Sequence, residues 1–501
     1  VGDDSQSIYS FRGANIDNIL NFKKNYPECT TYKLEQNYRS SKNIVEGANS
    51  LIKKNKFKID KNIWTLNDSG SKIILNRSQN DSDEGRFVAS NIFEEKNNNQ
   101  LNNGSFAVLY RTNAQSRSIE DALRKANIDY QVFGGLSFYQ RKEIKDVTAY
   151  LRLVVNSNDE ESFRRIVNFP PRGIGLKTLE KLLIISEREN ISMYDAINII
   201  DKYPKLFNKG VMGRITDFRN LIESLKIESK TKNADYVLTN VINGSGIIDF
   251  YRNEGSVESI NRIENIEELR SGINDFILEQ KELADGDTSI TRYLQDISLY
   301  SETDKSFSSD RVSLMTIHMA KGLEFNVVYV VGIEENLFPS ILSLNSSEDL
   351  EEERRLFYVA MTRAKDKLIL SHCDFRFKWG NIIECEPSRF IEEVDLAYIE
   401  KNNFKEEFKP TIDNNISRIR KLRKRGFVNV NKVDNNNSPI INIVVNDIVE
   451  HQRFGLGLVE KIEGDIQNKK ATINFKIGGR KTILLKFAKL KIKKGIWIPF
   501  F

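Results

Sequence analysis

The chain has 501 residues, of which 40% are hydrophobic and 29% are charged, as in an ordinary globular protein. At roughly 150 residues per domain, this length predicts about three or four domains. The net charge of +5 permits a polyanionic partner without requiring one. Three cysteines and three histidines argue against a disulfide framework or a metal centre and favour a reducing cytoplasm. No apolar run approaches the ~20 residues of a membrane-spanning helix, so we expect no membrane partner.

Two parts of the sequence have the pattern of a parallel α/β layer. Residues 106–111 (FAVLYR) are typical of a buried strand, and the helix-forming segment SIEDALRKANI follows them. Residues 313–333 return to strand, loop and strand, and residues 356–372 predict a helix followed by a strand. Strands that alternate with helices indicate a parallel sheet. From about 145 to 305 the pattern is one of long amphipathic helices, so we expect an all-helical block inserted into an α/β domain.

The two ends of the chain differ from this pattern. Residues 1–33 predict a loop and then an amphipathic helix that includes Ile16 and Phe22. Residues 399–440 are rich in lysine and asparagine, include the basic run RIRKLRKR, and indicate a flexible linker. Short β-rich runs separated by turns follow from about residue 441 and predict a small β-barrel.

Four stretches of the sequence carry the functional signal, and their order and combination matter more than any one of them. They are VGDDSQSIYSFRGA at 1–14, LEQNYRSS at 34–41, TIHMAKGLEF at 316–325 and EEERRLFYVAMTRAKDKL at 351–368. Together they resemble the UvrD/PcrA family of superfamily-one DNA helicases, and the resemblance covers nearly the whole chain. The resemblance implies an α/β fold of the RecA-like, P-loop type, with an incomplete first sheet domain and a near-complete second one.

The resemblance also assigns a role to each part of the chain. We expect residues 1–33 to be the C-terminal end of the first RecA-like domain. The remaining parts are, in chain order, the first part of the second RecA-like domain (34–144), the inserted helical domain that contacts duplex DNA (145–305), the second part of the RecA-like domain (306–398), the basic linker (399–440) and a Tudor-like barrel (441–495).

Five residues match positions that serve the nucleotide in this family. The resemblance places Gln6 at the γ-phosphate and attacking water, where an amide can both donate and accept a hydrogen bond. It places Tyr38 on the adenine and Glu324 on the ribose hydroxyls. Arg39 and Arg363 correspond to the arginines that neutralise the transferred phosphoryl group, for which a permanently charged planar guanidinium is suited. The implied cofactors are ATP and Mg²⁺.

A second group of residues matches positions that contact single-stranded DNA. Aromatic rings at Tyr9 and Phe11 suit stacking on unpaired bases, which contributes ~1–3 kcal/mol per base. Arg12 follows them directly. Thr316 and His318 match a segment that contacts the strand and couples it to the nucleotide. In the same stretch, Gly322 is expected to let the backbone turn sharply.

Within the helical block, NFPPRGIGLKTLEKL at 168–182 indicates a phosphate-binding turn. Gly173 and Gly175 open a tight turn before a helix that we expect to be capped near Thr178. Exposed amides at a helix N-terminus bind phosphate without reading sequence, and Arg172 and Lys177 add positive charge. The stretch resembles the hairpin with which the family's mobile domain grips duplex DNA.

The resemblance implies an ATP-dependent helicase that moves 3′ to 5′ on DNA. No G-x-x-x-x-G-K-[ST] motif occurs, so we expect a chain that begins after this loop and hydrolyses no ATP alone. The alternative is a non-hydrolysing protein that binds DNA or RNA polymerase, the latter through the C-terminal barrel. A helicase–nuclease subunit is disfavoured because no C-terminal cluster of carboxylates and lysine is present.

Overall fold

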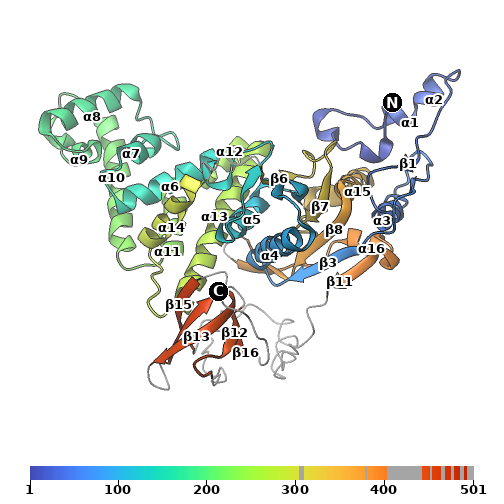
Figure 1. Ribbon diagram of the computed structural model, residues 1–501. Coiled ribbons are helices and arrows are strands. Elements are labelled where there is room, and N and C mark those ends of the chain that lie inside the picture. Colours follow the sequence, from blue (N-terminus) through green and yellow to red (C-terminus); the bar gives the residue numbers. More distant parts are fainter. Residues whose placement is uncertain are drawn as a thin grey trace, which may run out of the picture. The chain divides into compact units, whose positions relative to one another are not determined.

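The computed structural model describes residues 1–303, 310–378, 381–402, 443–451, 454–463, 469–475, 479–485 and 490–492 (Figure 1). The chain divides into two compact units, Val1–Glu400 and Lys401–Phe501. The basic run at 418–425 and most of the predicted linker lie outside the described residues. Within the described residues, no helix has both the length and the apolar character needed to cross a membrane.

A seven-stranded sheet organises the first unit, with the strand order β11-β3-β8-β7-β4-β6-β5 (Figure 1). The strands are β3 (Ile73–Ser78), β4 (Phe106–Tyr110), β5 (Tyr130–Val132), β6 (Val312–Thr316), β7 (Phe325–Val330), β8 (Ala364–Cys373) and β11 (Ile399–Asn402). Every pairing from β3 across to β5 is parallel. β4 lies between β7 and β6 in the sheet, although β4 precedes the helical block in the sequence and β6 and β7 follow it. The two flanking segments therefore build one sheet, which confirms the predicted α/β class.

Helices cover both faces of this sheet, which explains why β4 is apolar along its whole length. Alternate residues of a strand point to opposite faces. Ala107 and Leu109 join one core, whereas Phe106, Val108 and Tyr110 join the other. The helices that pack into the first core are α3 (Lys42–Ile52), α15 (Ser347–Met361) and α16 (Arg389–Glu393). The helices that pack into the second core are α4 (Asp81–Asn99) and α5 (Ser116–Lys125).

The inserted block is helical and has a hydrophobic core of its own. Its helices are α6 (Lys142–Val155), α7 (Glu160–Ile166), α8 (Leu176–Glu189), α9 (Met193–Asn198), α10 (Lys209–Ser229), α11 (Ala234–Ser245), α12 (Ile247–Glu254), α13 (Val257–Glu282) and α14 (Ile290–Thr303). Asn208, Asn233 and Ser256 each accept a hydrogen bond from a first-turn amide and so define where α10, α11 and α13 begin. Helical structure starts with α6, slightly before residue 145.

The N-terminal segment departs from the continuous helix that the sequence suggests. It forms two single-turn helices, α1 (Asp17–Leu20) and α2 (Phe22–Asn25), and neither contains a buried residue. Phe22 is 52% exposed, and its ring centre lies 4.9 Å from that of Tyr26. A helix this short gains too little from its own hydrogen bonds to be stable without packing, which explains the break.

The second unit contains a five-stranded antiparallel sheet in the order β15-β14-β13-β12-β16. Its strands are β12 (Ile448–His451), β13 (Gly455–Glu463), β14 (Lys470–Phe475), β15 (Gly479–Leu484) and β16 (Leu490–Ile492). A Cβ atom on Gly457 would lie 2.6 Å from Phe475, so glycine allows β13 and β14 to pack closely. The short strands match the sequence prediction. The first residues of the predicted linker instead form β11 of the large sheet.

Candidate functional site

The NYRSS segment is fastened to the beginning of β8. Ser40 Oγ donates a hydrogen bond to the carbonyl of Ala364 at 2.6 Å. The side-chain oxygen of Asn37 accepts from the backbone amides of Arg39 and Ser40, both at 2.9 Å. This turn leaves the ring of Tyr38 78% exposed. The segment therefore presents an open aromatic face beside a fixed arginine.

Glu324 lies between two cations at this edge of the sheet. Its carboxylate accepts from Arg39 Nε at 2.8 Å and pairs with Lys365 Nζ at 2.9 Å. The hydrogen bonds from Lys365 and Arg39 lower the pKa of Glu324 to about 2. The side chain is 45% exposed, so solvent screens both pairs and the ion cluster contributes little to stability. The carboxylate is charged at neutral pH and remains accessible to a ligand.

Arg363 has no carboxylate among its described partners. Its guanidinium donates to the carbonyls of Val359 and Leu323 and to Thr362 Oγ1, each at 3.1 Å. Arg39 Nη1 donates to the carbonyl of Thr362 at 3.3 Å, so two guanidinium groups meet at this residue. Burial and the nearby charge of Arg39 lower the pKa of Arg363 to about 10. The two guanidinium groups concentrate positive charge, and an anionic ligand would reduce the repulsion between them.

Gln6 and Tyr9 are tied to the loop that follows β6. Tyr9 Oη donates to the carbonyl of His318 at 2.9 Å. Lys321 Nζ donates to the carbonyl of Gln6 at 2.8 Å and lies 5.2 Å from the centre of the Tyr9 ring. The side-chain amide of Gln6 donates to Asp3 at 2.6 Å. The sequence reasoning did not single out Lys321, although it stands within the quoted motif and links both predicted residues.

The remaining residues predicted to contact single-stranded DNA lie on the same loops. Thr316 ends β6, and His318 lies two residues further along the chain. Burial, followed by the charges of Arg111 and Arg12, lowers the pKa of His318 to about 4. The imidazole is therefore neutral at physiological pH. Phe11 falls in a 3₁₀ turn, and its side chain lies outside the described part of the structure.

The Gly-x-Gly turn of the helical block is narrow and partly covered by α10. Gly173 has φ = +73°, and Arg214 Nη1 donates to its carbonyl at 2.9 Å. A Cβ atom on Gly173 would lie 2.2 Å from that nitrogen. Gly175 is the N-cap of α8, and a Cβ atom there would meet nothing within 4 Å. Arg214 could not be found from the motif because it is distant in sequence.

Two details of this turn differ from the sequence expectation. α8 begins at Leu176 after the extended residue Gly175, so Thr178 lies in the first turn, buried, rather than at the cap. Glycine has no side chain with which to cap, which explains why no side-chain cap bond forms. Arg172 does not add charge at the surface, because its guanidinium is engaged by backbone carbonyls.

The structure separates the predicted residues into two groups. Segments from residues 1–14, 34–41, 316–325 and 351–368 meet on the sheet through the contacts described above. The turn before α8 belongs to the helical block, whose core does not include residues of the sheet. Lys365 is a further residue that the motif reasoning missed. It follows Arg363 by two positions and supplies the second counter-charge for Glu324, at 2.9 Å.

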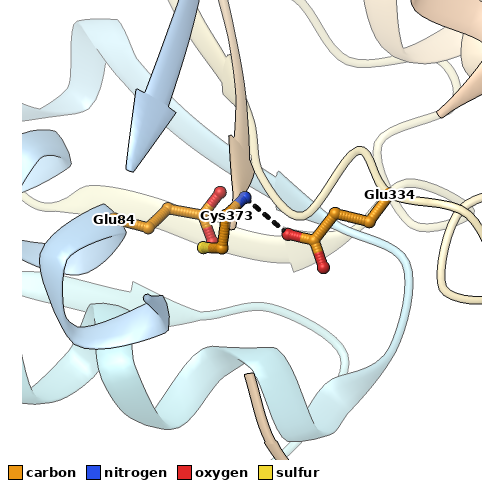
Figure 2. A group of neighbouring side chains, drawn as sticks. All are labelled: Glu84, Glu334 and Cys373. Atoms are coloured by element: carbon orange, nitrogen blue, oxygen red, sulfur yellow. Dashed lines mark hydrogen bonds between the residues drawn. The ribbon is translucent and has the colours of Figure 1, made fainter. Parts of the chain in front are cut away.

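A separate group of acidic and thiol side chains lies inside the sheet domain. Figure 2 shows Glu84, Glu334 and Cys373, whose ligand atoms lie within 4.8 Å of one another. Arg376 donates to both carboxylates, at 2.8 Å to Glu84 and 2.7 Å to Glu334. The backbone amide of Cys373 also donates to Glu334 at 2.8 Å. Burial raises the pKa of the Cys373 thiol well above its ordinary value. The group is a buried ion network compensated by arginine, not an open ligand set.

Comparison with known families agrees with this arrangement. The model of the UvrD-like helicase C-terminal domain matches residues 32–374, which is more than half of the chain, and the chain therefore belongs to this family. The model of the UvrD/REP helicase N-terminal domain matches residues 1–27. The model of the PcrA/UvrD tudor domain matches residues 445–492, which include all five strands of the second unit.

Curated relatives share this organisation over nearly the whole chain. The ATP-dependent DNA helicase PcrA of Staphylococcus aureus strain Mu50 is 38% identical over 496 residues, or 99% of this chain. The protein of the same name from Staphylococcus epidermidis strain ATCC 12228 is 37% identical over 498 residues. The chain spans 66% of the length of each of these relatives.

Proposed function

We propose that this chain works in an ATP-dependent DNA helicase and that its sheet supplies one side of the nucleotide site. The observation that carries the proposal is the pair Arg39 and Arg363. The guanidinium of Arg363 is buried, has no carboxylate partner among the described residues, and has the guanidinium of Arg39 beside it. Unbalanced positive charge of this kind is suited to the phosphoryl group of a nucleotide.

The residues around this pair fit the rest of ATP. The exposed ring of Tyr38 offers a face on which adenine can stack. Glu324 is charged and partly exposed, so it can accept hydrogen bonds from two ribose hydroxyls once it releases Arg39. Binding would then free Arg39 to turn towards phosphate. Nucleotide and Arg39 compete for the same carboxylate, which links occupancy of the site to the position of the arginine.

The described acidic residues near this site do not fit a magnesium ion. Lys61 Nζ pairs with both Asp3 and Asp4, and the Asp4 carboxylate also accepts from the amide of Ile59 at 3.0 Å. Glu324 is held by two cations. Mg²⁺ needs carboxylate or carbonyl oxygens that it can approach directly or through water. We therefore assign no metal-binding role to these residues.

For single-stranded DNA we propose a track formed by the first segment and the loop after β6. The contact residues are Tyr9, Phe11, Arg12, Thr316 and His318. Tyr9 is bonded to the His318 backbone, and the neighbouring Gln6 is bonded through its carbonyl to the same loop. A nucleotide-dependent movement of Gln6 would therefore reach the residues that hold the strand. This connection would couple hydrolysis to movement along the strand, for which we propose the 3′-to-5′ direction.

For duplex DNA we propose the turn before α8, with contacts from Gly173, Gly175, Lys177 and Thr178. The first amides of a helix have no acceptor within the helix, and they bind phosphate without regard to sequence. The open space above Gly175 allows a phosphate to approach these amides closely. For the second unit we propose RNA polymerase as a partner, through the sheet that matches the tudor model.

The test is DNA-stimulated ATP hydrolysis and strand separation by the protein that carries this chain. We expect hydrolysis to rise when single-stranded DNA is added and a partial duplex with a 3′ tail to be unwound. Binding of DNA without any stimulated hydrolysis would contradict the helicase proposal. That outcome would favour the non-hydrolysing protein that binds DNA or RNA polymerase.

A further inference from the structure

Arg172, which precedes the Gly-x-Gly turn, is surrounded by oxygen atoms of the backbone. Nη1 donates to the carbonyls of Ile166 at 3.1 Å, Phe169 at 2.9 Å and Pro170 at 3.3 Å. Nη2 donates to the carbonyl of Ser245 at 3.2 Å and to Tyr150 Oη at 2.6 Å. The described residues include no carboxylate that pairs with this guanidinium.

Helix ends supply the negative charge that compensates Arg172. Ile166 is the last residue of α7, and Ser245 is the last residue of α11. The final carbonyls of a helix lack partners within the helix and carry its negative partial charge. The guanidinium carbon also lies 5.8 Å from the ring centre of Tyr150 and 5.5 Å from that of Phe218. Arg172 therefore joins the turn to α6, α7, α10 and α11 at one point.

A second side chain sets the backbone of the turn itself. The side-chain oxygen of Asn168 accepts from the amides of Arg172 and Ile174, both at 2.9 Å. Ile174 is fully buried between the two glycines and fixes the turn to the core. At the start of α8 the amide of Thr178 donates to the carbonyl of Gly175 at 2.9 Å, whereas the amides of Leu176 and Lys177 have no hydrogen-bond acceptor among the described residues. The phosphate-facing side of the turn is thus ordered before any ligand arrives.

We infer that Asn168 and Arg172 are positioning residues that preorganise this turn for duplex DNA. The inference rests on the proposed duplex contact and deepens it. Neither residue touches phosphate; each holds the turn rigid against the helical core. A binding loop that is already ordered loses less conformational entropy on association, so its affinity is higher. Rigidity also means that force applied to the duplex is transmitted to four helices instead of bending a loop.

The experiment measures binding of the 501-residue chain to a fluorescein-labelled DNA hairpin duplex and to a single strand. The variants are Asn168→Ala, Arg172→Met and Arg172→Lys, with Lys177→Ala as the reference for a direct phosphate contact. Asn168→Ala changes no charge, so it separates positioning from electrostatics. We expect it to weaken duplex binding about tenfold, the scale of the neutral hydrogen bonds from backbone amides that order the turn. Binding of the single strand should not change.

Two further readouts distinguish positioning from a general loss of stability. Hydrogen exchange at the amides of Arg172 and Ile174 should accelerate in Asn168→Ala, whereas the rest of the helical block keeps its protection. Arg172→Lys should recover part of the duplex affinity that Arg172→Met loses, because an ammonium group still donates to the helix-end carbonyls. Lys177→Ala should reduce the salt dependence of binding by about one unit of slope without changing exchange.

Each possible result supports or overturns the inference. It is overturned if Asn168→Ala accelerates exchange but leaves duplex affinity unchanged, since order in the turn would then not matter. It is also overturned if only Arg172 variants weaken binding, because Arg172 would then act through charge. If Lys177→Ala and Gly175→Ala also bind duplex normally, the proposed duplex contact itself fails. If Arg172→Met does not fold, the measurements on Asn168→Ala still test the inference.

Discussion

Two guanidinium groups, a buried one in the sheet domain and a half-buried one in the helical block, differ in how their charge is compensated. Arg363 has three neutral acceptors and a second guanidinium nearby, and its pKa is lowered to about 10. Arg172 has five acceptors, two of them at helix ends, and lies close to two aromatic rings. Neither pairs with a carboxylate among the described residues.

This difference separates a binding residue from a positioning residue. A cation beside a like charge gains when an anion arrives, so Arg363 is suited to bind phosphate. A cation whose donors are satisfied by helix ends gains little from a ligand, so Arg172 is suited to hold structure. Both residues are arginines in short motifs, and the motifs alone do not distinguish these roles. The following changes test the distinction.

The largest effect is expected for Arg363→Ala in the protein that carries this chain. If Arg363 stabilises the transferred phosphoryl group as proposed, its loss should lower ATP turnover by about 10³-fold or more. Affinity for duplex DNA should stay within about twofold, because the turn is in another part of the fold. Steady-state ATPase rates and DNA binding are measured on the same preparation. Near-normal ATP turnover would contradict the assignment of Arg363 to the nucleotide site.

A smaller effect is expected for the two glycines of the turn. Gly173→Ala should lower both stability and duplex affinity, because a non-glycine residue at φ = +73° costs about 1–2 kcal/mol. Gly175→Ala should lower duplex affinity alone, since φ there is −83° and the added Cβ meets only open space. Thermal unfolding and duplex binding of the 501-residue chain separate the two. Equal loss of stability in both variants would contradict the backbone geometry described for the two glycines.

The smallest effect concerns the stability of the sheet at acid pH. Hydrogen bonds from Lys365 and Arg39 hold the pKa of Glu324 at about 2, below the value near 4.3 expected for an unfolded glutamate. The stabilisation is therefore present above about pH 4.3 and is lost as the pH falls towards about 2. Glu324→Gln should unfold at a slightly lower temperature than the unsubstituted chain at neutral pH. The difference should vanish near about pH 2. A difference that does not depend on pH would mean that the ion pairs do not form.

Much of the architecture could be predicted from the sequence because its signals are local. The apolar run at 106–111, the helical periodicity of 145–305 and the short strands after residue 441 each reflect one element and its burial. The helix expected near Phe22 is present as two single turns, α1 and α2, that are divided at Asn21. Helical spacing alone does not stabilise a longer helix when none of its residues is buried.

The candidate site could be predicted only in part, because some of its contacts join residues that are distant in sequence. Gln6, Arg39, Glu324 and Arg363 carry strong motif signals, and the structure brings their segments together. The roles of Lys321 and Arg214 depend on contacts with residues that are distant in sequence. No local pattern encodes such contacts, because they depend on how strands and helices pack.

By itself, the sequence determined the family, the α/β class and the identity of the residues in the four motifs. Side-chain chemistry and spacing along the chain are enough for those conclusions. Only the tertiary structure decided which arginine is left with unbalanced charge and which is compensated. Compensation depends on the carbonyls, helix ends and neighbouring charges that folding places around a group, and Arg172 and Arg363 differ in this surrounding.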